Sequence, residues 1–306
     1  MSLPTFADPK VDFAFKRIFG SEDHKDILIA FLNDLLGLEG DHRIVKVDLL
    51  SPELRPVAPA MKASIVDVRC RDGRGVSYVV EMQVLKVEGF EKRVVYNAAK
   101  AYVMQLAAGS PYPELNDVVG ITICDFVMWP DEGERKIPML SRWQMAEEQT
   151  GRRGLGQIRL MFLELPKYDA SRPPQTMVER WAYFFREAAS LTTIPDVLSA
   201  PPFGDALEAA RVARFTVEEW DAHILQCLAI MDARGMISAA ERRGRHLGEL
   251  LGQERGLRHG LCHAVEVLCH AFGIELTDHR RSELVSLPVE GLTALLARLQ
   301  ERKSWA

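Results

Sequence analysis

Hydrophobic residues recur at two different spacings along this chain, and the changes between them predict its elements. From residue 10 to 36 they recur every three or four positions, as on one face of a helix, with a break near Gly20. Residues 88–108 show the same helical spacing. Strand-like alternation or short continuous apolar runs occur in the segments 43–51, 64–72, 76–84, 117–129, 135–144 and 157–164. This order of helices and strands predicts a mixed α/β fold.

The pattern changes after the proline-containing stretch 171–175, which is the best candidate for a linker. Beyond it we find only helical spacing, with long helices expected over 205–273 and two shorter ones over 277–302. We therefore expect an α/β domain over residues 1–170 and an all-helical C-terminal region over 171–306.

Five glycines stand at a strict four-residue spacing inside the predicted long helix: Gly244, Gly248, Gly252, Gly256 and Gly260. Each costs about 1 kcal/mol relative to alanine in a helix interior. A four-residue step advances about 40° around a helix, so the glycines trace a slow spiral. Two interpretations are open. The spiral lets another helix approach closely, which favours a homodimer through the C-terminal region, or it marks a helix of low stability that frays.

Charge and composition narrow the function without fixing it. The formal net charge is −5, which argues mildly against a tight, non-specific nucleic-acid binder but not against an enzyme with local contacts. No apolar run approaches the roughly 20 residues of a membrane span. The first residues lack the basic and apolar regions of a signal peptide. We expect no membrane partner, a cytoplasmic location and, from five scattered cysteines, reduced thiols.

Two carboxylates lie in otherwise apolar strands. Asp67 and Glu81 occupy the two arms of a hairpin predicted over 64–84, joined by the turn DGRG at 72–75. Gln83 shares a strand face with Glu81, because it lies two residues further on. Carboxylates in such strands need a metal ion or a partner to compensate them, and hard divalent cations prefer carboxylate oxygens. The alternative is an edge hairpin whose acids face solvent.

The order of several segments is more specific than any one of them. These segments are DFAFKRIFG (12–20), FLNDLLG (31–37), KASIVDVRCRDGRG (62–75), VEMQV (80–84), FEKRVVYNAAKAYVMQLAAGSPYPEL (90–115), VVGITICDF (118–126), FLELPKYD (162–169) and WAYFF (181–185). In this order they resemble the recombination-promoting nuclease/transposase family of the PD-(D/E)xK nuclease superfamily. The resemblance continues through the glycine-rich helix and so covers nearly the whole chain.

This resemblance implies a restriction-endonuclease-like mixed sheet flanked by helices, followed by the helical C-terminal region. It also implies a DNA endonuclease that depends on Mg²⁺ or Mn²⁺. Asp67 and Glu81 take the places of the metal-binding carboxylates, and the backbone carbonyl of Met82 is a further ligand. Gln83 stands where the wider superfamily often has lysine, as is usual within this family, and is expected to orient the attacking water. Its amide brings no positive charge, so the site relies more on the metal or works slowly.

Two helices supply further candidates. Arg93 and Tyr96 are three residues apart and share a helix face, from which they can contact a phosphate and brace the carboxylates. Lys16 lies four residues after Asp12 and matches the family's spacing. The alternatives are that Tyr96 is a core residue, that Arg93 is solvated, and that Asp12 and Lys16 form an ordinary surface salt bridge. Asn33 is expected to fasten a helix end.

A cluster near the C-terminus offers a second metal hypothesis. His259, Cys262, His263 and Glu266 have helix-compatible spacing for zinc, but they lack paired C-x-x-C turns, so a core cysteine beside exposed histidines is favoured. Three functions remain open. The first is a metal-dependent DNA endonuclease that promotes recombination or is linked to mobile elements. The second is a catalytically weak or inactive DNA-binding or assembly protein that retains the nuclease fold. The third is a helical interaction scaffold carried by residues 173–306.

Overall fold

The computed structural model describes residues 4–55, 62–131 and 136–305. The chain divides into two compact units, Met1–Met231 and Asp232–Ala306, and each has a hydrophobic core of its own.

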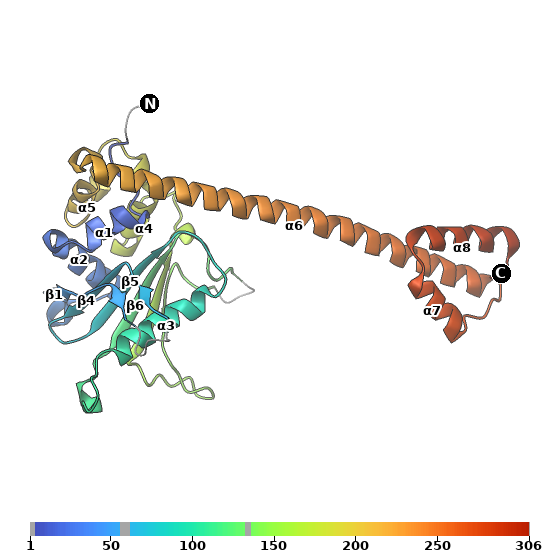
Figure 1. Cartoon of the computed structure of the whole chain (residues 1–306), viewed down its shortest axis with the longest axis horizontal. Helices are drawn as coiled ribbons and strands as arrows, with labels where there is room; N and C mark the ends of the chain where they lie inside the picture. The colour runs from blue at the N-terminus through green and yellow to red at the C-terminus, as the bar shows by residue number, and fades with distance from the viewer. Residues whose placement is uncertain (1–3, 56–61, 132–135, 306) are drawn as a thin grey trace. The chain divides into compact units, whose positions relative to one another are not determined.

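The first unit is built on a six-stranded mixed sheet with the strand order β1-β4-β5-β6-β8-β7 (Figure 1). The three central strands β5, β6 and β8 run parallel, while β1, β4 and β7 pair antiparallel with their neighbours. The bounds of these strands are β1 Val47–Leu49, β4 Val68–Asp72, β5 Ser77–Gln83, β6 Val118–Cys124, β7 Leu140–Trp143 and β8 Ile158–Glu164. Every residue of β6 is buried, as its continuous apolar run predicts for a central strand.

Helices cover both faces of this sheet (Figure 1). Helix α3 (Phe90–Val103) packs on one face, here named the α3 face, where it meets Val79 of β5. The opposite face, here named the α2 face, carries the main core and four helices, and it includes Tyr78 and Val80 of β5. Those helices are α1 Asp12–Phe19, α2 Lys25–Leu36, α4 Met177–Glu187 and α5 Phe203–Ala209. The chain therefore has the expected mixed sheet flanked by helices.

The predicted break in the first helical segment is present at Gly20. Helix α1 ends at Phe19, a short 3₁₀ turn covers Glu22–His24, and α2 begins at Lys25. A Cβ at residue 20 would lie 2.8 Å from the carbonyl oxygen of Lys16, so glycine permits this tight exit. Other 3₁₀ turns are Gly40–His42, Tyr112–Glu114, Leu165–Lys167, Ala188–Ser190, Asp196–Leu198 and Val212–Arg214.

The segment 64–72 is not one strand, contrary to the prediction from its alternation. β3 (Ser64–Ile65) pairs with β2 (Glu53–Leu54) in a separate two-stranded sheet, and only β4 joins the main sheet. Between them the N–H of Val66 donates to the carbonyl of Pro52 over 3.0 Å, and the Val66 side chain is buried in the cluster under α3. The chain bends at Asp67 because the residues before it pair with β2 in one sheet and the residues after it pair with β1 and β5 in the other. Alternation reports which side chains are buried, but not which strand they pair with.

The second unit is entirely helical in its described residues. It contains the larger part of α6 (Val217–Ala271), which is a single helix of 55 residues, together with α7 (Asp278–Ser286) and α8 (Val289–Arg302). The last turns of α6 pack against α7 and α8 around Val265, Leu284 and Leu292. This agrees with the expected helical C-terminal region, except that the predicted 205–273 segment consists of α5 and α6 separated by a turn.

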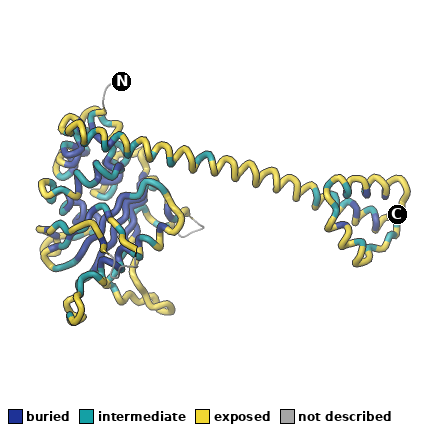
Figure 2. The backbone as a smooth tube through the Cα atoms, viewed as in Figure 1, coloured by how far each residue is buried: buried dark blue, intermediate teal, exposed yellow. Residues whose placement is uncertain are grey.

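The middle of α6 is exposed on all sides. Every residue from 240 to 257 is exposed (Figure 2). A Cβ added at any of the five spaced glycines would meet no atom within 4 Å in the described part of the chain. No contact within the second unit therefore explains these glycines.

None of the helices in the described ranges could cross a lipid bilayer. The division of the chain into domains at residue 170 stays a prediction, because compactness alone does not establish which segments fold independently.

Candidate active site

Asp67 lies at the bend between β3 and β4, beside the end of β5. Its Oδ2 atom accepts the N–H of Met82 over 2.7 Å. This bond fixes the carboxyl group against the backbone of β5, one residue beyond Glu81. The side chain is half-buried. The two carboxylates predicted from the hairpin are therefore brought to the same end of β5.

Glu81 is a buried carboxylate, 8% exposed, within β5. It pairs in register with Thr122 of the parallel strand β6. Its Oε1 atom accepts a hydrogen bond of 2.8 Å from the side-chain amide of Asn97 on α3. Asn97 is itself buried, and its Oδ1 atom has no hydrogen-bond partner among the described residues. Helix α3 thus fixes the orientation of Glu81 from one face of the sheet.

The surroundings of both carboxyl groups oppose their ionisation. Burial, followed by the negative charges of Asp12 and Glu81, raises the pKa of Asp67 to about 7, against the lowering effects of the Met82 amide and Lys16. Burial also raises the pKa of Glu81, although the hydrogen bond from Asn97 and the charge of Arg93 lower it. Carboxyl groups in this state are stabilised in their charged form by a nearby cation, and oxygen ligands of this kind suit a hard divalent metal.

Gln83 and Arg93 form a linked pair next to Glu81. The Nη2 group of Arg93 donates to Oε1 of Gln83, and the amide Nε2 of Gln83 donates to the carbonyl of Leu85 over 2.8 Å. Both ends of the glutamine amide are therefore engaged. In this arrangement Gln83 holds the Arg93 guanidinium in place, and its role in orienting a water stays a prediction.

Tyr96 contacts the chain just before β3. Its hydroxyl donates to the carbonyl of Lys62 over 3.0 Å, and the same carbonyl accepts the Lys100 ammonium over 2.7 Å. Lys100 is buried, 6% exposed, and its ammonium lies 5.6 Å from the centre of the Tyr96 ring. These two side chains of α3 fasten the segment that leads to Asp67.

Lys16 approaches the site from α1. It forms an ion pair of 2.7 Å with Asp12, four residues earlier, and both charges affect the pKa of Asp67. The pair therefore lies within electrostatic reach of the carboxylates. The side chains of Lys16 and Asp12 are 40% and 45% exposed. The ammonium of Lys16 is therefore accessible to a ligand that binds beside the carboxylates.

Two important neighbours were not predicted from the sequence, namely Asn97 and Lys100. The signal for them was present, because they follow Arg93 by four and seven residues and so share its helix face. Single polar residues in an amphipathic helix give no indication of which strand residue they will meet.

The other candidate residues have structural contacts. Asn33 holds the segment after α2 through two hydrogen bonds with the backbone of Ile44, as expected for a fastening residue. His263 and Glu266 approach only to 4.0 Å. In the ranges described above, no group of three or more His, Cys, Asp or Glu side chains is placed to hold a metal ion.

Comparison with protein families matches residues 9–240 to the model of the PD-(D/E)XK nuclease family transposases. The chain belongs to this family. Comparisons with curated proteins and with solved structures give no match. The fold and the family together define a protein of the nuclease and transposase type.

Proposed function

We propose that this protein is a divalent-metal-dependent DNA endonuclease whose metal ligands are Asp67, Glu81 and the backbone carbonyl of Met82. The observation that carries the proposal is the bond from the N–H of Met82 to Asp67, which brings the Asp67 carboxyl group beside the residue that follows Glu81 in β5. The N–H and C=O groups of a strand residue point to the same side, so the Met82 carbonyl faces the side on which its N–H binds Asp67. Two carboxylates and a carbonyl are a suitable donor set for Mg²⁺ or Mn²⁺.

The bound cation would supply a water of lowered pKa and would stabilise negative charge on the scissile phosphate. Around it, we propose that Lys16 and Arg93 bind phosphate oxygens; their positive charges lower the pKa of Asp67 and of Glu81, respectively, which supports a position near the site. Asn97 keeps Glu81 oriented. Gln83 is proposed to orient the attacking water after exchanging its contact with Leu85, and Tyr96 to brace the bend that carries Asp67.

A plasmid-nicking assay tests this function. We expect the purified protein to convert supercoiled plasmid DNA into nicked or linear DNA in the presence of Mg²⁺ or Mn²⁺, but not in EDTA. Asp67→Ala and Glu81→Ala should each remove at least about 99% of the cleavage, because each deletes a metal ligand. Asp48→Ala removes an exposed carboxylate of β1 and should cleave like the unaltered protein. Cleavage by Asp67→Ala at the unaltered rate would disprove the assignment.

A second candidate is a DNA-binding or assembly protein that keeps the nuclease fold without efficient catalysis. The engagement of both ends of Gln83, at the place of a lysine, favours it. It predicts DNA binding in EDTA with no cleavage under any metal condition. A role in recombination or in the movement of mobile elements fits either candidate, and a cytoplasmic location remains a prediction.

We also propose that the protein acts as a homodimer through α6. Large apolar side chains are exposed along this helix, including Ile237, Leu247 and Leu251 at 39%, 58% and 44%. With Ala240 and Gly244 they follow the alternating three- and four-residue spacing of a coiled-coil seam. Two copies would suit a nuclease that cuts both strands, because one active site cuts one strand at a time.

A further inference from the structure

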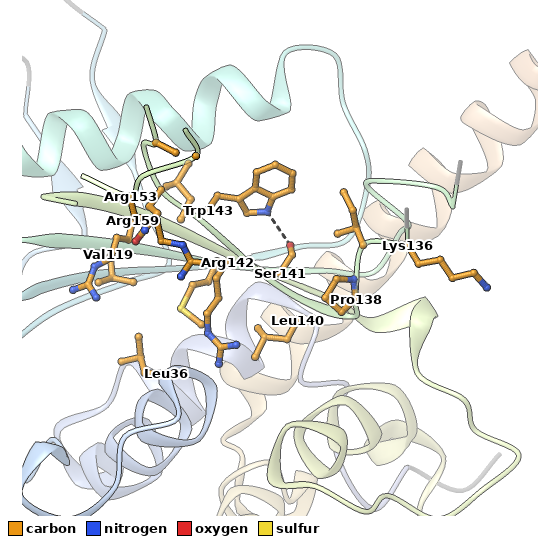
Figure 3. Close-up of a pocket in the computed structure, with 16 residues that line it drawn as sticks. Leu36, Val119, Lys136, Pro138, Leu140, Ser141, Arg142, Trp143, Arg153 and Arg159 are labelled. Carbon is orange, nitrogen blue, oxygen red and sulfur yellow. Dashed lines mark hydrogen bonds between the residues drawn. The ribbon is translucent and has the colours of Figure 1, made fainter. Parts of the chain in front are cut away.

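A separate cavity of about 720 Å³ lies at the β7 edge of the sheet. Its walls come from the end of α2, from β6, β7 and β8, and from the segments before and after β7, with Leu36, Val119 and Leu140 among its apolar residues. This size is that of an ordinary ligand pocket. Figure 3 shows its lining, with the three arginines grouped at one end and Lys136 at the other.

The charge of this cavity is opposite to that of the chain. Four of its lining residues are cations, namely Lys136, Arg142, Arg153 and Arg159, and none is an acid. The whole chain has 43 acidic against 38 basic residues. A pocket whose charged side chains are all positive, in a protein of net negative charge, is suited to an anion.

The three arginines retain unused hydrogen-bond donors. Arg142 donates through Nη2 to the carbonyl of Leu35 over 2.7 Å, which anchors it at the end of α2. Arg159 has a long contact of 3.4 Å with Asp117, and its buried Nε has no hydrogen-bond partner among the described residues. Within the same ranges, the Arg153 side chain makes no hydrogen bond or ion pair, although its backbone pairs with Ala146. Planar guanidinium groups with free donors match phosphate oxygens.

The apolar part of the lining narrows the class of ligand. Leu36 and Leu140, both half-buried, and the ring of Trp143, which is 39% exposed, offer a surface on which a flat apolar group can lie. A duplex presents its phosphates on a convex surface, whereas an unpaired nucleotide can place its base in a concave pocket and its phosphates at the rim. Proteins that bind single strands combine a positive groove with contacts to the faces of bases.

We propose that this cavity binds a segment of single-stranded DNA, with a base against the apolar surface and flanking phosphates on Arg142, Arg153 and Arg159. The inference rests on the proposed DNA substrate, but it concerns a site distinct from the carboxylates.

The strand register separates the two sites. Val119 pairs with Arg159 on β8, and Glu81 pairs with Thr122, three residues further along β6. That is about 10 Å along the strand at 3.3 Å per residue. Val119 and Met161 belong to the α2 face, whereas Glu81 is held by Asn97 on the α3 face.

Fluorescence anisotropy with the full-length protein tests the proposal. The probes are a labelled oligothymidylate of about 15 nucleotides, within the usual range of single-strand sites, and a duplex of equal length, both in EDTA. We expect Arg153→Gln/Arg159→Gln to weaken binding of the single strand about tenfold. The dependence of log affinity on log salt should fall by about 0.7 for each lost phosphate contact. Binding of the duplex should change little.

The single variant Arg153→Gln should also weaken binding of the single strand. Arg152→Gln is its matched control, because it removes the same charge from the next residue, which does not line the cavity. It should bind the single strand like the unaltered protein. An equal loss in both variants, or a loss confined to the duplex, would overturn the proposal.

A second measurement needs no variant. Cross-linking of the unaltered protein to a 4-thiothymidine oligonucleotide should map to residues 136–161, and a map that omits them would also overturn the proposal. Failure of plasmid cleavage together with arginine-dependent binding would refute the endonuclease and leave this site standing.

Discussion

A carboxyl group that is buried beside other acids keeps its proton to a higher pH than a free one, and Asp67 is such a group. Its pKa is about 7 in the folded chain, whereas a free aspartate has a pKa of 3.8. Between these values the folded state holds a proton that the unfolded state has lost. Stability therefore falls as pH rises from about 4 to about 7 and stays at the lower level above that. The penalty is on the order of 4 kcal/mol at 1.36 kcal/mol per pH unit.

The first prediction at the residue scale follows from this penalty. Asp67→Asn should raise the free energy of unfolding in EDTA at pH 8, because the neutral amide can still accept the Met82 N–H without carrying the charge. The gain should shrink towards zero near pH 4. Urea unfolding at several pH values measures it, with the exposed Asp48→Asn as control. A variant that is less stable than the unaltered protein at pH 8 would contradict the assigned cause.

The second prediction concerns the position of the missing lysine. The wider superfamily pattern predicts that Gln83→Lys preserves folding and either raises or leaves unchanged any metal-dependent cleavage. The structure predicts a loss of about 1 kcal/mol in stability, because a lysine removes the acceptor of Arg93 and places a like charge beside it. Adding Arg93→Gln should restore part of this loss. Thermal unfolding of the two single variants and the double variant measures the coupling, and simple additivity would argue against the Gln83–Arg93 contact.

The candidate site could be predicted only in part. The hairpin pattern and the family resemblance pointed to Asp67, Glu81 and Gln83, and helical spacing pointed to Arg93. The structure places these side chains at one end of β5. Asn97 was not predicted, because its partner Glu81 lies 16 residues away on another element. Contacts between a helix and the sheet beneath it depend on packing angles that periodicity does not encode.

At the scale of elements, the hydrophobic pattern predicted the type and order of the helices and strands better than it predicted their lengths. The continuous apolar strand β6, the break at Gly20 and the β4–β5 hairpin all agree with expectation. The predicted strand 43–51 contracts to Val47–Leu49, and 64–72 divides at Asp67. The first difference lies at the edge of the main sheet, where a strand ends once it has no neighbour to pair with, and the second lies where β3 leaves to pair with β2. An edge is a property of the whole sheet and leaves no mark in the strand's own residues.

The cavity at β7 shows the same limit. Its arginines come from three separated stretches of chain, at Arg142, Arg153 and Arg159. None of them belongs to a recognisable charge run, so their grouping emerges only when β7 folds back antiparallel on β8.

At the scale of the whole molecule, the dimer is the main prediction. Five glycines cost α6 about 4–5 kcal/mol relative to alanine, and among the described residues no atom lies within 4 Å of a Cβ added at any of them. We expect the full-length protein to be a dimer by light scattering and a chain ending at residue 231 to be a monomer. Leu247→Lys/Leu251→Lys should dissociate the dimer, because two charges would enter its apolar seam.

Gln253→Lys provides the control for this experiment. It adds a charge two residues after Leu251, close to the opposite side of the helix at 100° per residue, and should leave the dimer intact. The proposal would be refuted if the full-length protein were a monomer and hydrogen exchange showed that the amides of residues 241–260 are already protected. The helix would then be packed within its own chain.

The position of Glu81 has a consequence for regulation. Its backbone is part of the ladder with β6, and its side chain is held by α3. Ligands on mobile loops can be withdrawn by a small movement, but Glu81, as the proposed ligand, could be withdrawn only by breaking its bond to Asn97 or by opening the sheet. The proposed metal site therefore has no inactive conformation that lies close in energy to the active one. A cell that restrains the proposed nuclease has to act outside that site, through the supply of metal, the delivery of DNA or the abundance of the protein.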